Sequence, residues 1–523
     1  MAKSKASKNG ISRRQFLKTS VGVISAAGVG TLSTAGFAQS PPSSAARELI
    51  VAINADPDTL DTRTIVKTQA MAMHNHVCQA LLMRDPKGQL HPWLAESWRK
   101  TAPTEIVFKL RSGIKFTNGE PLDADAVKFT YDNFLVKGMF PSVSRQKQDW
   151  IRALDRVEVV DKSTVRFVLK YPSNAFMIYV PFYSILPPGA TKEMGDKFAL
   201  APVGTGPYKM GEYVPNSHLT LVANPDAWSG APKTPRLTFR FIPEDATRMA
   251  ALQSGEVCMV NNVTPDFATQ LSRMSTLQVK EISAARSMYI YILCNKPPFN
   301  KREARLAVSH AINRQALVRD AMGGHAKIGG SPWSPAVRYY DPSLQPDSYD
   351  LPKAKQLLAA AGYDGSVIKF GFPTGMWLND KIVAEFLLSS YKDLGLNVNA
   401  ETLDFAAYYS NEQKHLYNLQ MQSYGILPLH PDFWVGAILI NTDNSLVMHD
   451  DQKIFNLIAE ADKAPDERSI QKDYFELQRE ILDYAPVLNL YYFPYIVAQS
   501  TKLRGYEPRP DEHFFFWDAT LAS

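Results

Sequence analysis

Short apolar runs alternate along the chain with longer segments of helical character. The run Glu48-Leu49-Ile50-Val51-Ala52-Ile53 predicts a buried strand, and the turn-rich residues 54–58 predict its end. The same reasoning predicts strands at residues 106–110, 237–242, 288–293 and 487–497, and a hairpin at 157–169 around the turn 161–163. Helices are predicted at residues 68–82, 244–254, 302–313, 352–361 and 378–394, and after the capping residue Asp123.

This order of strands and helices predicts an α/β architecture. A chain of 523 residues is too long for one compact core and indicates two or three domains. The densest Pro/Gly punctuation, P-V-G-T-G-P-Y at residues 202–208, predicts a loop by which the chain returns to its first lobe.

The composition is that of a folded protein, and its basic excess is local. A hydrophobic content of 45% with 21% charged residues excludes disordered, collagen-like and coiled-coil classes. Residues 1–38 hold six of the 57 basic side chains and no acid, so the rest has 51 basic against 52 acidic residues. Because the net charge of +5 comes from this segment, we expect neither a nucleic-acid nor an acidic-membrane partner.

The N-terminal segment has the parts of an export signal. A basic stretch ends in S-R-R-Q-F-L-K at residues 12–18, an apolar run follows at 21–35, and Gly36-Phe37-Ala38 supplies the small residues that a signal peptidase reads. The S-R-R-x-F-L-K pattern resembles the twin-arginine export signal, whereas a Sec signal is usually more hydrophobic and lacks paired arginines. We expect residues 1–38 to be a twin-arginine signal peptide, recognised by the twin-arginine translocase and cleaved near Ala38, and the mature protein to be soluble and periplasmic.

The rest of the chain shows no membrane span and few cysteines. No later stretch reaches the ~18 apolar residues that a bilayer requires. Cys78, Cys258 and Cys294 are far apart with no CxxC pair, so neither an iron–sulfur cluster nor a structural zinc site is expected. An oxidising compartment permits one disulfide, most naturally Cys258–Cys294, but we prefer the interpretation of three buried thiols.

Motifs for metal and cofactor chemistry are missing from the sequence. On a helix, His74 and Cys78 would share a face while His76 points elsewhere, so the three are not expected to converge on a metal ion. H-E-x-x-H, G-x-S-x-G, Walker A and G-x-G-x-x-G patterns do not occur. The sequence therefore predicts no metal site and no cofactor.

Six segments carry a family resemblance, in the family's order. They are H-P-W-L-A-E-S-W (91–98), F-K-L-R-S-G-I-K-F-T-N-G-E-P-L (108–122), P-V-G-T-G-P-Y (202–208), A-A-L-Q-S-G-E-V (250–257), R-E-A-R-L-A-V-S-H-A-I-N-R (302–314) and A-K-Q-L-L-A-A-A-G-Y (354–363). Together they resemble the dipeptide/oligopeptide/nickel solute-binding proteins of ABC importers (family 5, cluster C). The resemblance spans residues 48–520, nearly the whole mature chain.

The resemblance implies a two-lobed α/β periplasmic binding protein fold, type II-like, with an extra subdomain in the first lobe. Solute would be held between the lobes. We expect residues 39–82, 205–285 and 496–523 to form the core of lobe I, residues 83–204 to form its extra subdomain, and residues 286–495 to form lobe II.

In the family, the segment that matches residues 421–434 crosses the cleft and offers an aromatic residue followed by glycine, as Tyr424-Gly425 does here. Dipeptide and oligopeptide binders then place an aspartate two residues after the aromatic residue, against the peptide ammonium group. Here that position is Ile426. Because an unpaired buried charge costs ~3–5 kcal/mol, the usual grip on a peptide is not expected. Asp432 could substitute, or it could be a surface or helix-capping acid.

A carboxylate-binding arginine is also implied by the resemblance. Arg145 lies in S-R-Q-K-Q-D-W (144–150), which resembles the segment by which nickel-chelate binders present an arginine to a ligand carboxylate. The guanidinium fork suits this role because it can meet both carboxylate oxygens. The alternative is a solvated charge beside Lys147.

Four more side chains are candidates for ligand contact. Trp377 follows a predicted strand and offers either a flat stacking surface or a core ring. Tyr424, His430 and Trp434 share the cleft segment, although His430 could equally be a hydrogen-bonded loop histidine. We expect Tyr424 and Trp377 to stack on the solute from opposite lobes.

Together these features predict a monomeric periplasmic receptor that closes around a small organic solute and delivers it to a membrane permease and ATPase, with no bond made or broken. Solute contacts with both lobes would shift the population towards the closed form. The ligand could be a peptide, a metal chelate, an oligosaccharide or an opine-like compound. The alternative is a cofactor-containing periplasmic enzyme, since twin-arginine export often serves such proteins, but no cofactor motif supports it.

Overall fold

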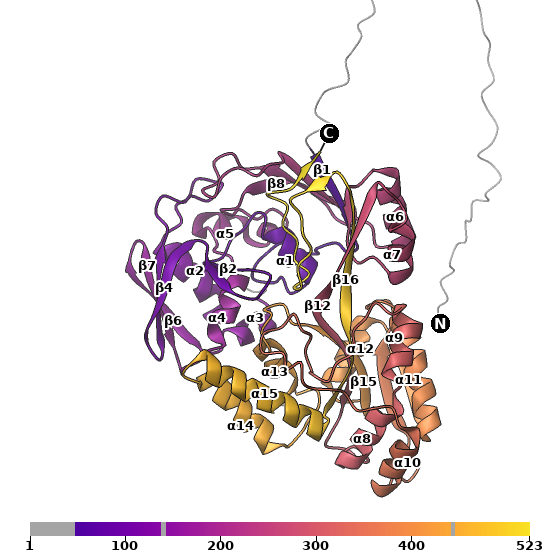
Figure 1. Cartoon of the computed structure of the whole chain (residues 1–523). Coiled ribbons are helices and arrows are strands. Elements are labelled where there is room, and N and C mark those ends of the chain that lie inside the picture. The colour runs from indigo at the N-terminus through magenta and orange to yellow at the C-terminus, as the bar shows by residue number, and fades with distance from the viewer. Residues whose placement is uncertain (1–47, 137–142, 441–444, 523) are drawn as a thin grey trace, which may run out of the picture. The chain divides into compact units, whose positions relative to one another are not determined.

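The computed structural model describes residues 48–136, 143–440 and 445–522 (Figure 1). These residues belong to one compact unit, Ser44–Ser523. The expected signal peptide, residues 1–38, lies outside the described residues. Of the helices in the described ranges, none is both long and apolar enough to span a bilayer.

A ten-stranded mixed sheet forms the framework of this unit. Its two longest strands, β12 (Leu277–Ile292) and β16 (Val487–Ser500), pair antiparallel in the middle. The second lobe continues from β12 through β15 (Leu419–Gly425), β13 (Ile368–Pro373) and β14 (Val398–Leu403). The first lobe continues from β16 through β11 (Met259–Val260), β1 (Glu48–Ile53), β10 (Arg236–Phe241), β9 (His218–Ala223) and β8 (Tyr208–Val214).

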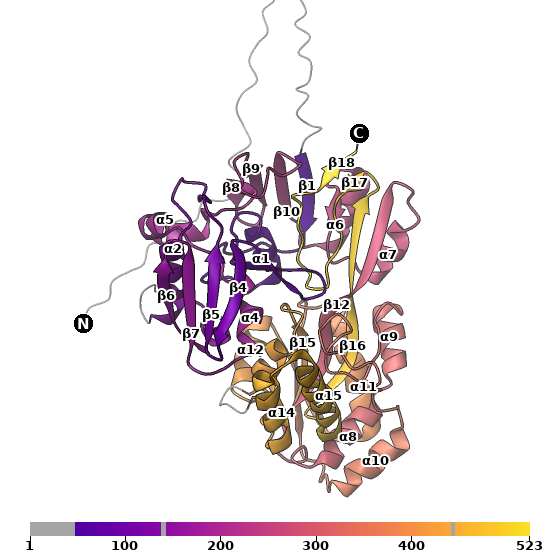
Figure 2. The same cartoon turned by 60° about the vertical axis from the view of Figure 1, so that its left-hand side comes forward.

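Strands β12 and β16 belong to both lobes and join them (Figure 2). β12 pairs with β15 only from Arg286 onward, whereas β11 pairs with the far end of β16, at Gln499. Between these two regions the β12–β16 register shifts, from Ser283 to Ser287 and again at Met288. Register irregularities of this kind bend a strand and increase its twist. The ladder therefore changes direction where the two lobes meet.

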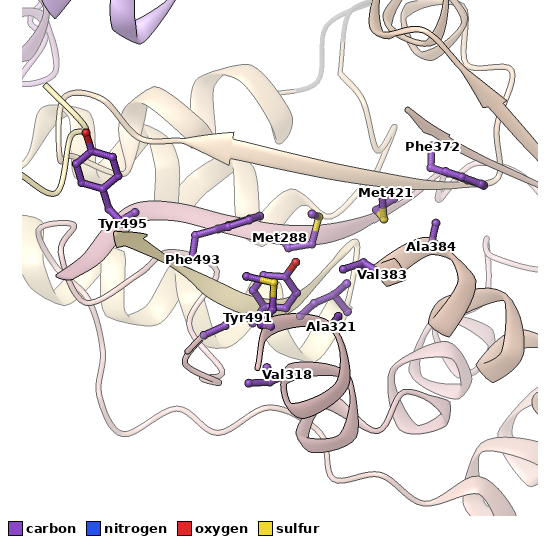
Figure 3. Close-up of a cluster of buried hydrophobic side chains, with 14 of the residues drawn as sticks. Met288, Val318, Ala321, Phe372, Val383, Ala384, Met421, Tyr491, Phe493 and Tyr495 are labelled. Carbon is purple, nitrogen blue, oxygen red and sulfur yellow. The ribbon is translucent and has the colours of Figure 1, made fainter. Parts of the chain in front are cut away.

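Hydrophobic side chains fix the second lobe's helices to its sheet (Figure 3). Two of these helices, α9 (Arg314–Met322) and α11 (Asp380–Leu394), lie against strands β12, β15 and β16. The buried side chains are Met288, Met421 and Tyr491 from the sheet, and Val318, Ala321, Val383 and Ala384 from the helices. Each large side chain of this kind contributes about 1.5–3 kcal/mol on burial, so the lobe has a core of its own.

The other helices of the second lobe begin mostly at aspartates. Asp350, for example, accepts a hydrogen bond from the N–H of Lys353, as expected for an N-cap. The predicted helices at 302–313, 352–361 and 378–394 are confirmed to within two residues. The helices are α8 (Arg302–Ala311), α10 (Leu351–Ala360), α12 (Phe405–Gln413), α13 (Asp432–Ile438), α14 (Gln452–Lys463) and α15 (Glu467–Tyr484).

The first lobe carries fewer helices on its half of the sheet. Glu244 caps α6 (Asp245–Ser254) by accepting from the N–H groups of Ala246 and Thr247, which confirms the predicted helix. The remaining elements of this part are α1 (Thr68–His74), α7 (Pro265–Leu271), β17 (Leu503–Arg504) and β18 (Thr520–Leu521).

A separate four-stranded antiparallel sheet, with its helices, lies between β1 and β8 in the chain. Its order is β4 (Ala95–Ala102), β5 (Glu105–Leu110), β7 (Thr164–Leu169) and β6 (Leu154–Asp161). The remaining elements are the ribbon β2 (Leu82–Arg84) and β3 (Leu90–Pro92), the helices α2 (Ala124–Leu135), α3 (Arg145–Trp150), α4 (Phe176–Tyr179) and α5 (Pro188–Met194), and the 3₁₀ helices η2 (Val180–Phe182) and η3 (Gly195–Ala199). We call this part the extra subdomain.

Local patterns in the extra subdomain predicted some of its elements. The hairpin around residues 161–163 is confirmed as β6 and β7. Asp123 caps α2, with its side chain accepting from the N–H of Ala126. The expected residue boundaries of the two lobes and of the subdomain stay a prediction.

The predicted helix at residues 68–82 is wrong in its second half, because α1 ends at His74. The chain beyond it packs against the Pro/Gly loop at residues 202–208. Gly206 N–H donates to Val77 O at 2.8 Å, and a Cβ at Gly204 would lie 2.0 Å from the same oxygen. The two backbones approach so closely that only glycine fits, and the helix cannot continue through this contact.

The cysteines and the neighbouring histidines are buried in the first and second lobes. Cys78, Cys258 and Cys294 are free buried thiols, which confirms the preferred interpretation. Burial raises the pKa of Cys258 and of Cys294 to about 12. His76 bonds through Nδ1 to Ala72 O, and its Nε2 accepts from the N–H of Phe516. Its ring nitrogens are therefore used in packing the C-terminal segment.

Candidate functional site

The cleft segment, residues 421–434, leads from the sheet of the second lobe towards the first. β15 ends at Gly425, and the chain then enters α13 at Asp432. A Cβ at Gly425 would lie 2.7 Å from Nη2 of Arg286. Arg286 is itself held by Glu512, with 2.7 Å between Nε and Oε1. The glycine after Tyr424 therefore leaves room for the Arg286–Glu512 ion pair, which a larger residue would displace.

Aromatic rings from both lobes meet at this segment. Phe433 on α13 lies 5.2 Å from Trp150 on α3, 6.3 Å from Tyr179 on α4 and 6.4 Å from Phe182 on η2, measured between ring centroids. On its own lobe, Phe433 lies 5.7 Å from Tyr424. Such rings offer flat apolar faces for a ligand and contact each other when the lobes are together.

One acidic side chain completes the contact between the lobes. Asp432 is buried and accepts a hydrogen bond of 2.8 Å from the hydroxyl of Tyr179. Burial raises the pKa of Asp432 to about 6, the charge of Asp462 acts in the same direction, and Tyr179 and Arg152 oppose it. Asp462 in turn accepts from Ser173 Oγ at 2.9 Å. Asp432 is thus neither a surface acid nor a helix-capping acid.

Ile426 occupies the position at which peptide-binding relatives were expected to carry an aspartate. It is 1% exposed and belongs to a hydrophobic cluster that both lobes share. Its backbone N–H donates to Ala285 O at 2.7 Å, which fixes the chain beside β12. The surroundings of this position are therefore apolar, like the side chain.

Trp434 and His430, two of the predicted ligand contacts, lie in packed surroundings. Trp434 is fully buried, and its Nε1–H donates to the hydroxyl of Tyr291 at 3.2 Å. His430 lies edge-on to the rings of Tyr339 and Tyr474. Burial, together with nearby arginines, lowers the pKa of His430 to about 3, so its ring is neutral. Both side chains support the cleft segment from behind.

Trp377 and Tyr424 lie in the same lobe, so the expectation that they face a solute from opposite lobes is wrong. Trp377 follows β13 and Tyr424 is near the end of β15, and these two strands pair in parallel. Asp380 accepts hydrogen bonds from the backbone N–H groups of the loop that carries Trp377. The ring of Trp377 contacts Phe405 edge-on, at 6.3 Å. Parallel strands bring both aromatic residues to one edge of the sheet.

Arg145 begins α3, and its side chain lies outside the described residues. Lys147, two residues further on, is 1% exposed. Its Nζ donates to Thr62 O at 2.5 Å and to Phe182 O at 2.9 Å. Lys147, named in the sequence only as the neighbour of Arg145, therefore lies inside the first lobe.

A cavity of about 40 Å³ lies beside Lys147 and is lined by residues of the first lobe and its extra subdomain. Its wall includes Phe182, which also meets Phe433 across the lobes. The polar and charged side chains of the lining are Thr62, His74, Asn75, Arg84, Lys147, Ser184, Arg509, Asp511 and His513. The cavity thus borders the aromatic contact between the lobes.

The charged groups of this cavity are unevenly paired. Arg509 Nη2 lies 2.9 Å from Asp511 Oδ2. Burial by itself would raise the pKa of Asp511, but His513 and Arg509 hold that pKa well below its usual range. Burial lowers the pKa of Lys147 to about 7 and that of Arg84 to about 10. The lining therefore holds two buried cations without a carboxylate in contact among the described residues.

Sequence reasoning missed Arg84, Lys147 and Asp511. A single arginine after the apolar Leu81-Leu82-Met83 was the one local signal, because a charge directly after a buried strand must be solvated or paired. Nothing in the sequence links Asp511 to Arg84, since 427 residues separate them and only the fold brings them together.

Comparison with known proteins places the chain in a family. Residues 89–445 match the family described as "Bacterial extracellular solute-binding proteins, family 5 Middle". The Glutathione-binding protein GsiB of Escherichia coli (strain K12) is 26% identical over 500 residues, which cover 91% of this chain and 95% of that protein.

Solved structures show the same fold. The periplasmic binding protein DppA from Helicobacter pylori, in complex with the peptide STSA, has a TM-score of 0.81 at 22% identity and covers 91% of this chain and 99% of its own. AgaA from A. tumefacien R10, in complex with agropinic acid, has a TM-score of 0.78 at 22% identity, covering 90% and 98%. These likenesses confirm the predicted two-lobed α/β binding protein fold. The chain belongs to the family 5 bacterial extracellular solute-binding proteins, the solute receptors of ABC importers.

Proposed function

We propose that this receptor is exported by the twin-arginine pathway, loses its first 38 residues to a signal peptidase and works as a monomer in the periplasm. The S-R-R-x-F-L-K pattern at residues 12–18 supports this route. The similar protein DppA from H. pylori is an ABC transporter-associated periplasmic binding protein, which supports the same compartment. The solute would pass from the receptor to a membrane permease and its ATPase, with no bond made or broken.

Binding would act through the balance between separated and joined lobes. The bent β12–β16 ladder supplies a place for the lobes to rotate, and the bond from Tyr179 to Asp432 joins them in the described form. A solute that contacts both lobes lowers the free energy of the joined form only and so raises its population.

We infer that the solute is an acidic or neutral organic compound rather than an unmodified di- or tripeptide. Ile426 carries this inference, because its position and surroundings are apolar. A peptide ammonium group placed there would be desolvated without a partner, at a cost of about 3–5 kcal/mol. Asp432 is already engaged by Tyr179 and lies near Arg152, so it is a poor replacement.

The proposed contacts are the rings at the lobe boundary and one arginine. Tyr424 can supply a stacking face from the second lobe, next to Phe433. Trp377 offers a second ring on the same sheet edge, and Arg145 remains a candidate for a ligand carboxylate. His430 and Trp434 would act by holding the cleft segment in place, since both are buried behind it.

Isothermal calorimetry on the purified protein is the direct test. The compounds to compare are agropinic acid and glutathione, which the names of similar proteins associate with this fold, and a mixed dipeptide library. We expect agropinic acid to bind tenfold or more tightly than any dipeptide and than glutathione, which carries a free ammonium group. N-acetylation should leave the weak response to dipeptides unchanged, because no carboxylate holds the amine.

A different result would reassign the site. Micromolar binding of dipeptides that disappears when their amine is acetylated would contradict the inference from Ile426. Asp432→Asn would then decide whether that acid has taken over the role, because the variant keeps an oxygen for Tyr179 but loses the charge.

A further inference from the structure

The cavity beside Lys147 shares walls with the contact between the lobes. Phe182 lines it and stacks at 6.4 Å on Phe433 of the second lobe. Arg84 also lines it and donates from Nη1 to Leu427 O, in the cleft segment, at 3.2 Å. If the lobes separate, both contacts are lost and the cavity borders the open cleft. A group on a bound solute could therefore enter it.

The cavity carries positive charge that its own acid does not balance. Asp511 is matched by Arg509, at 2.9 Å, and by His513. Arg84 and Lys147 are held by backbone oxygens, and neither forms a salt bridge with any carboxylate in the described ranges. Carbonyl groups solvate a buried cation but do not neutralise it, so an anion in the cavity would be strongly favoured.

Three nitrogens on the cavity's side chains have no hydrogen-bond partner among the residues that the structure describes, and one of them, His513 Nδ1, lies 3.5 Å from Asp511 Oδ2. Arg84 Nε is a donor, buried and unpaired. His74 Nε2 is also buried and unpaired, while Nδ1 of the same ring lies 2.8 Å from Leu60 O. Because a carbonyl oxygen only accepts, the proton of the neutral ring is on Nδ1 and Nε2 is a free acceptor. The lining thus offers charge, a donor and an acceptor.

The size of the cavity limits what can enter. About 40 Å³ is roughly three water-sized centres. A carboxylate with the carbon that bears it fits this space, whereas a whole ligand typically needs several hundred Å³. Water could satisfy Arg84 Nε and His74 Nε2, but it would place no carboxylate in direct contact with Arg84 or Lys147.

We propose that this cavity is the subsite for one carboxylate of the solute, held by Arg84 and Lys147, with His74 accepting a hydrogen bond from a hydroxyl next to that carboxylate. The inference rests on the proposed function, since it takes the solute to be an organic acid, and it narrows that class to 2-hydroxy acids. The rest of the solute would lie between Phe182 and the rings of the second lobe.

Three matched probes separate the contribution of the carboxylate charge to binding from that of the hydroxyl group. Malate carries a hydroxyl beside a carboxylate, succinate lacks the hydroxyl, and succinamide lacks the charge. Thermal unfolding of the purified protein is followed with each probe at millimolar concentration, because a ligand of the folded state raises the melting temperature. We expect the largest shift with malate, a smaller one with succinate and none with succinamide.

Variants then locate the response in the cavity. Arg84→Gln and Lys147→Gln should each weaken binding of malate and succinate at least tenfold, and Arg84→Lys should retain part of it. His74→Leu should remove the advantage of malate over succinate and leave succinate unchanged. Arg248→Gln is the control, because Arg248 is fully buried and bonded to backbone oxygens, as Arg84 is, although it also pairs with Asp245, and it does not line the cavity. It should lower the melting temperature and keep the acid response.

Each contrary outcome is informative. No shift with either acid, an equal shift with succinamide, or an unchanged acid response in folded Arg84→Gln and Lys147→Gln would overturn the subsite. A separate result, tight binding of dipeptides that depends on their free amine, would contradict the proposed function. A protein that prefers agropinic acid to dipeptides but responds to succinate equally in both variants would retain the proposed function and lose the subsite.

Discussion

Ile426 and Asp432 lie six positions apart in the cleft segment, and both are buried. Ile426 packs within a hydrophobic cluster, and Asp432 is bonded to Tyr179 of the other lobe. A carboxylate can meet a ligand ammonium only if its oxygens are not already engaged. The residue type alone therefore made Asp432 a candidate partner for a ligand ammonium group. Its hydrogen bond with Tyr179 argues against that role.

Replacing Asp432 by asparagine should change how stability depends on pH. Burial raises its pKa to about 6 from 3.8, so between about pH 4 and 6 the folded state holds a proton that the unfolded state has lost. Stability of the wild type therefore falls as the pH rises through this window, by up to about 3 kcal/mol. Asp432→Asn should remove this fall and be more stable than the wild type at pH 7.5.

Urea unfolding at pH 4.0, 5.0, 6.0 and 7.5 measures the effect. Arg152 and Tyr179 favour the charged form of Asp432 and Asp462 opposes it, so Asp462→Asn should reduce the slope without abolishing it. A variant as pH-dependent as the wild type would show that other groups cause the slope.

Alanine substitutions at Tyr424 and Trp434 should distinguish a ring that contacts the ligand from a ring that belongs to the core. Tyr424 is partly buried at the lobe boundary, so Tyr424→Ala should weaken solute binding by about 1–3 kcal/mol and change the unfolding free energy little. Trp434 is fully buried, so Trp434→Ala should cost about 3–5 kcal/mol of stability. Calorimetry and urea unfolding of both variants test this, and a large stability loss with unchanged affinity in Tyr424→Ala would make that ring part of the core.

Helix α1 shows how a distant loop ends a secondary-structure element. Residues 68–82 have the composition of one helix, but the chain turns after His74 and packs against Gly204 and Gly206. The loop could be recognised from its prolines and glycines, whereas its contact with Val77 could not, because more than 120 residues separate them.

Gly204→Ala should therefore be strongly destabilising. Its Cβ would lie 2.0 Å from Val77 O, so the backbone must shift, at a cost of about 1–3 kcal/mol or more. Gly436→Ala is the matched control, because its Cβ would lie 3.8 Å from Nη1 of Arg152, an ordinary contact, and the residue lies within α13. There alanine should gain about 0.5–1 kcal/mol from helix propensity. Equal unfolding midpoints for the two variants would contradict the close approach.

The whole molecule depends on two strands that run through both lobes. β12 and β16 pair with second-lobe strands at one end and first-lobe strands at the other, with an irregular register between. Tyr179, Arg84 and Ser173 add contacts from the first lobe and its subdomain that a solute-free opening would break. If the solute binds where we propose, motion of the lobes and binding would involve the same side chains and would therefore be coupled.

The proposed export route can be tested on the precursor. Arg13→Lys with Arg14→Lys should leave full-length precursor in the cytoplasm, because the twin-arginine route would read the paired guanidinium groups rather than their charge. Lys3→Gln with Lys5→Gln is the control, since it lowers the charge of the segment and keeps the pair. Immunoblots of cell fractions measure both, and normal periplasmic accumulation of the arginine variant would exclude the twin-arginine assignment.

For the site, the sequence determined which segment to examine and the tertiary structure decided what its residues do. The aromatic–glycine pair at Tyr424 and the isoleucine two residues on were readable directly, because they lie within one short stretch. The cavity was not, because Arg84, Lys147 and Asp511 come from three distant parts of the chain. Burial and pairing of charges depend on what surrounds them, and sequence spacing carries no such information.

For the fold, the sequence by itself determined the elements whose signals are local. Short apolar runs predicted β1 and β10, alternation predicted β5, and the capping residue Asp123 predicted α2, because such patterns and N-caps act within a few residues. The end of α1, the full length of β12 and the joining of the lobes through β12 and β16 were decided only in the tertiary structure. These features depend on contacts between backbone segments far apart in the chain. Such contacts stabilise the structure only once the lobes have folded.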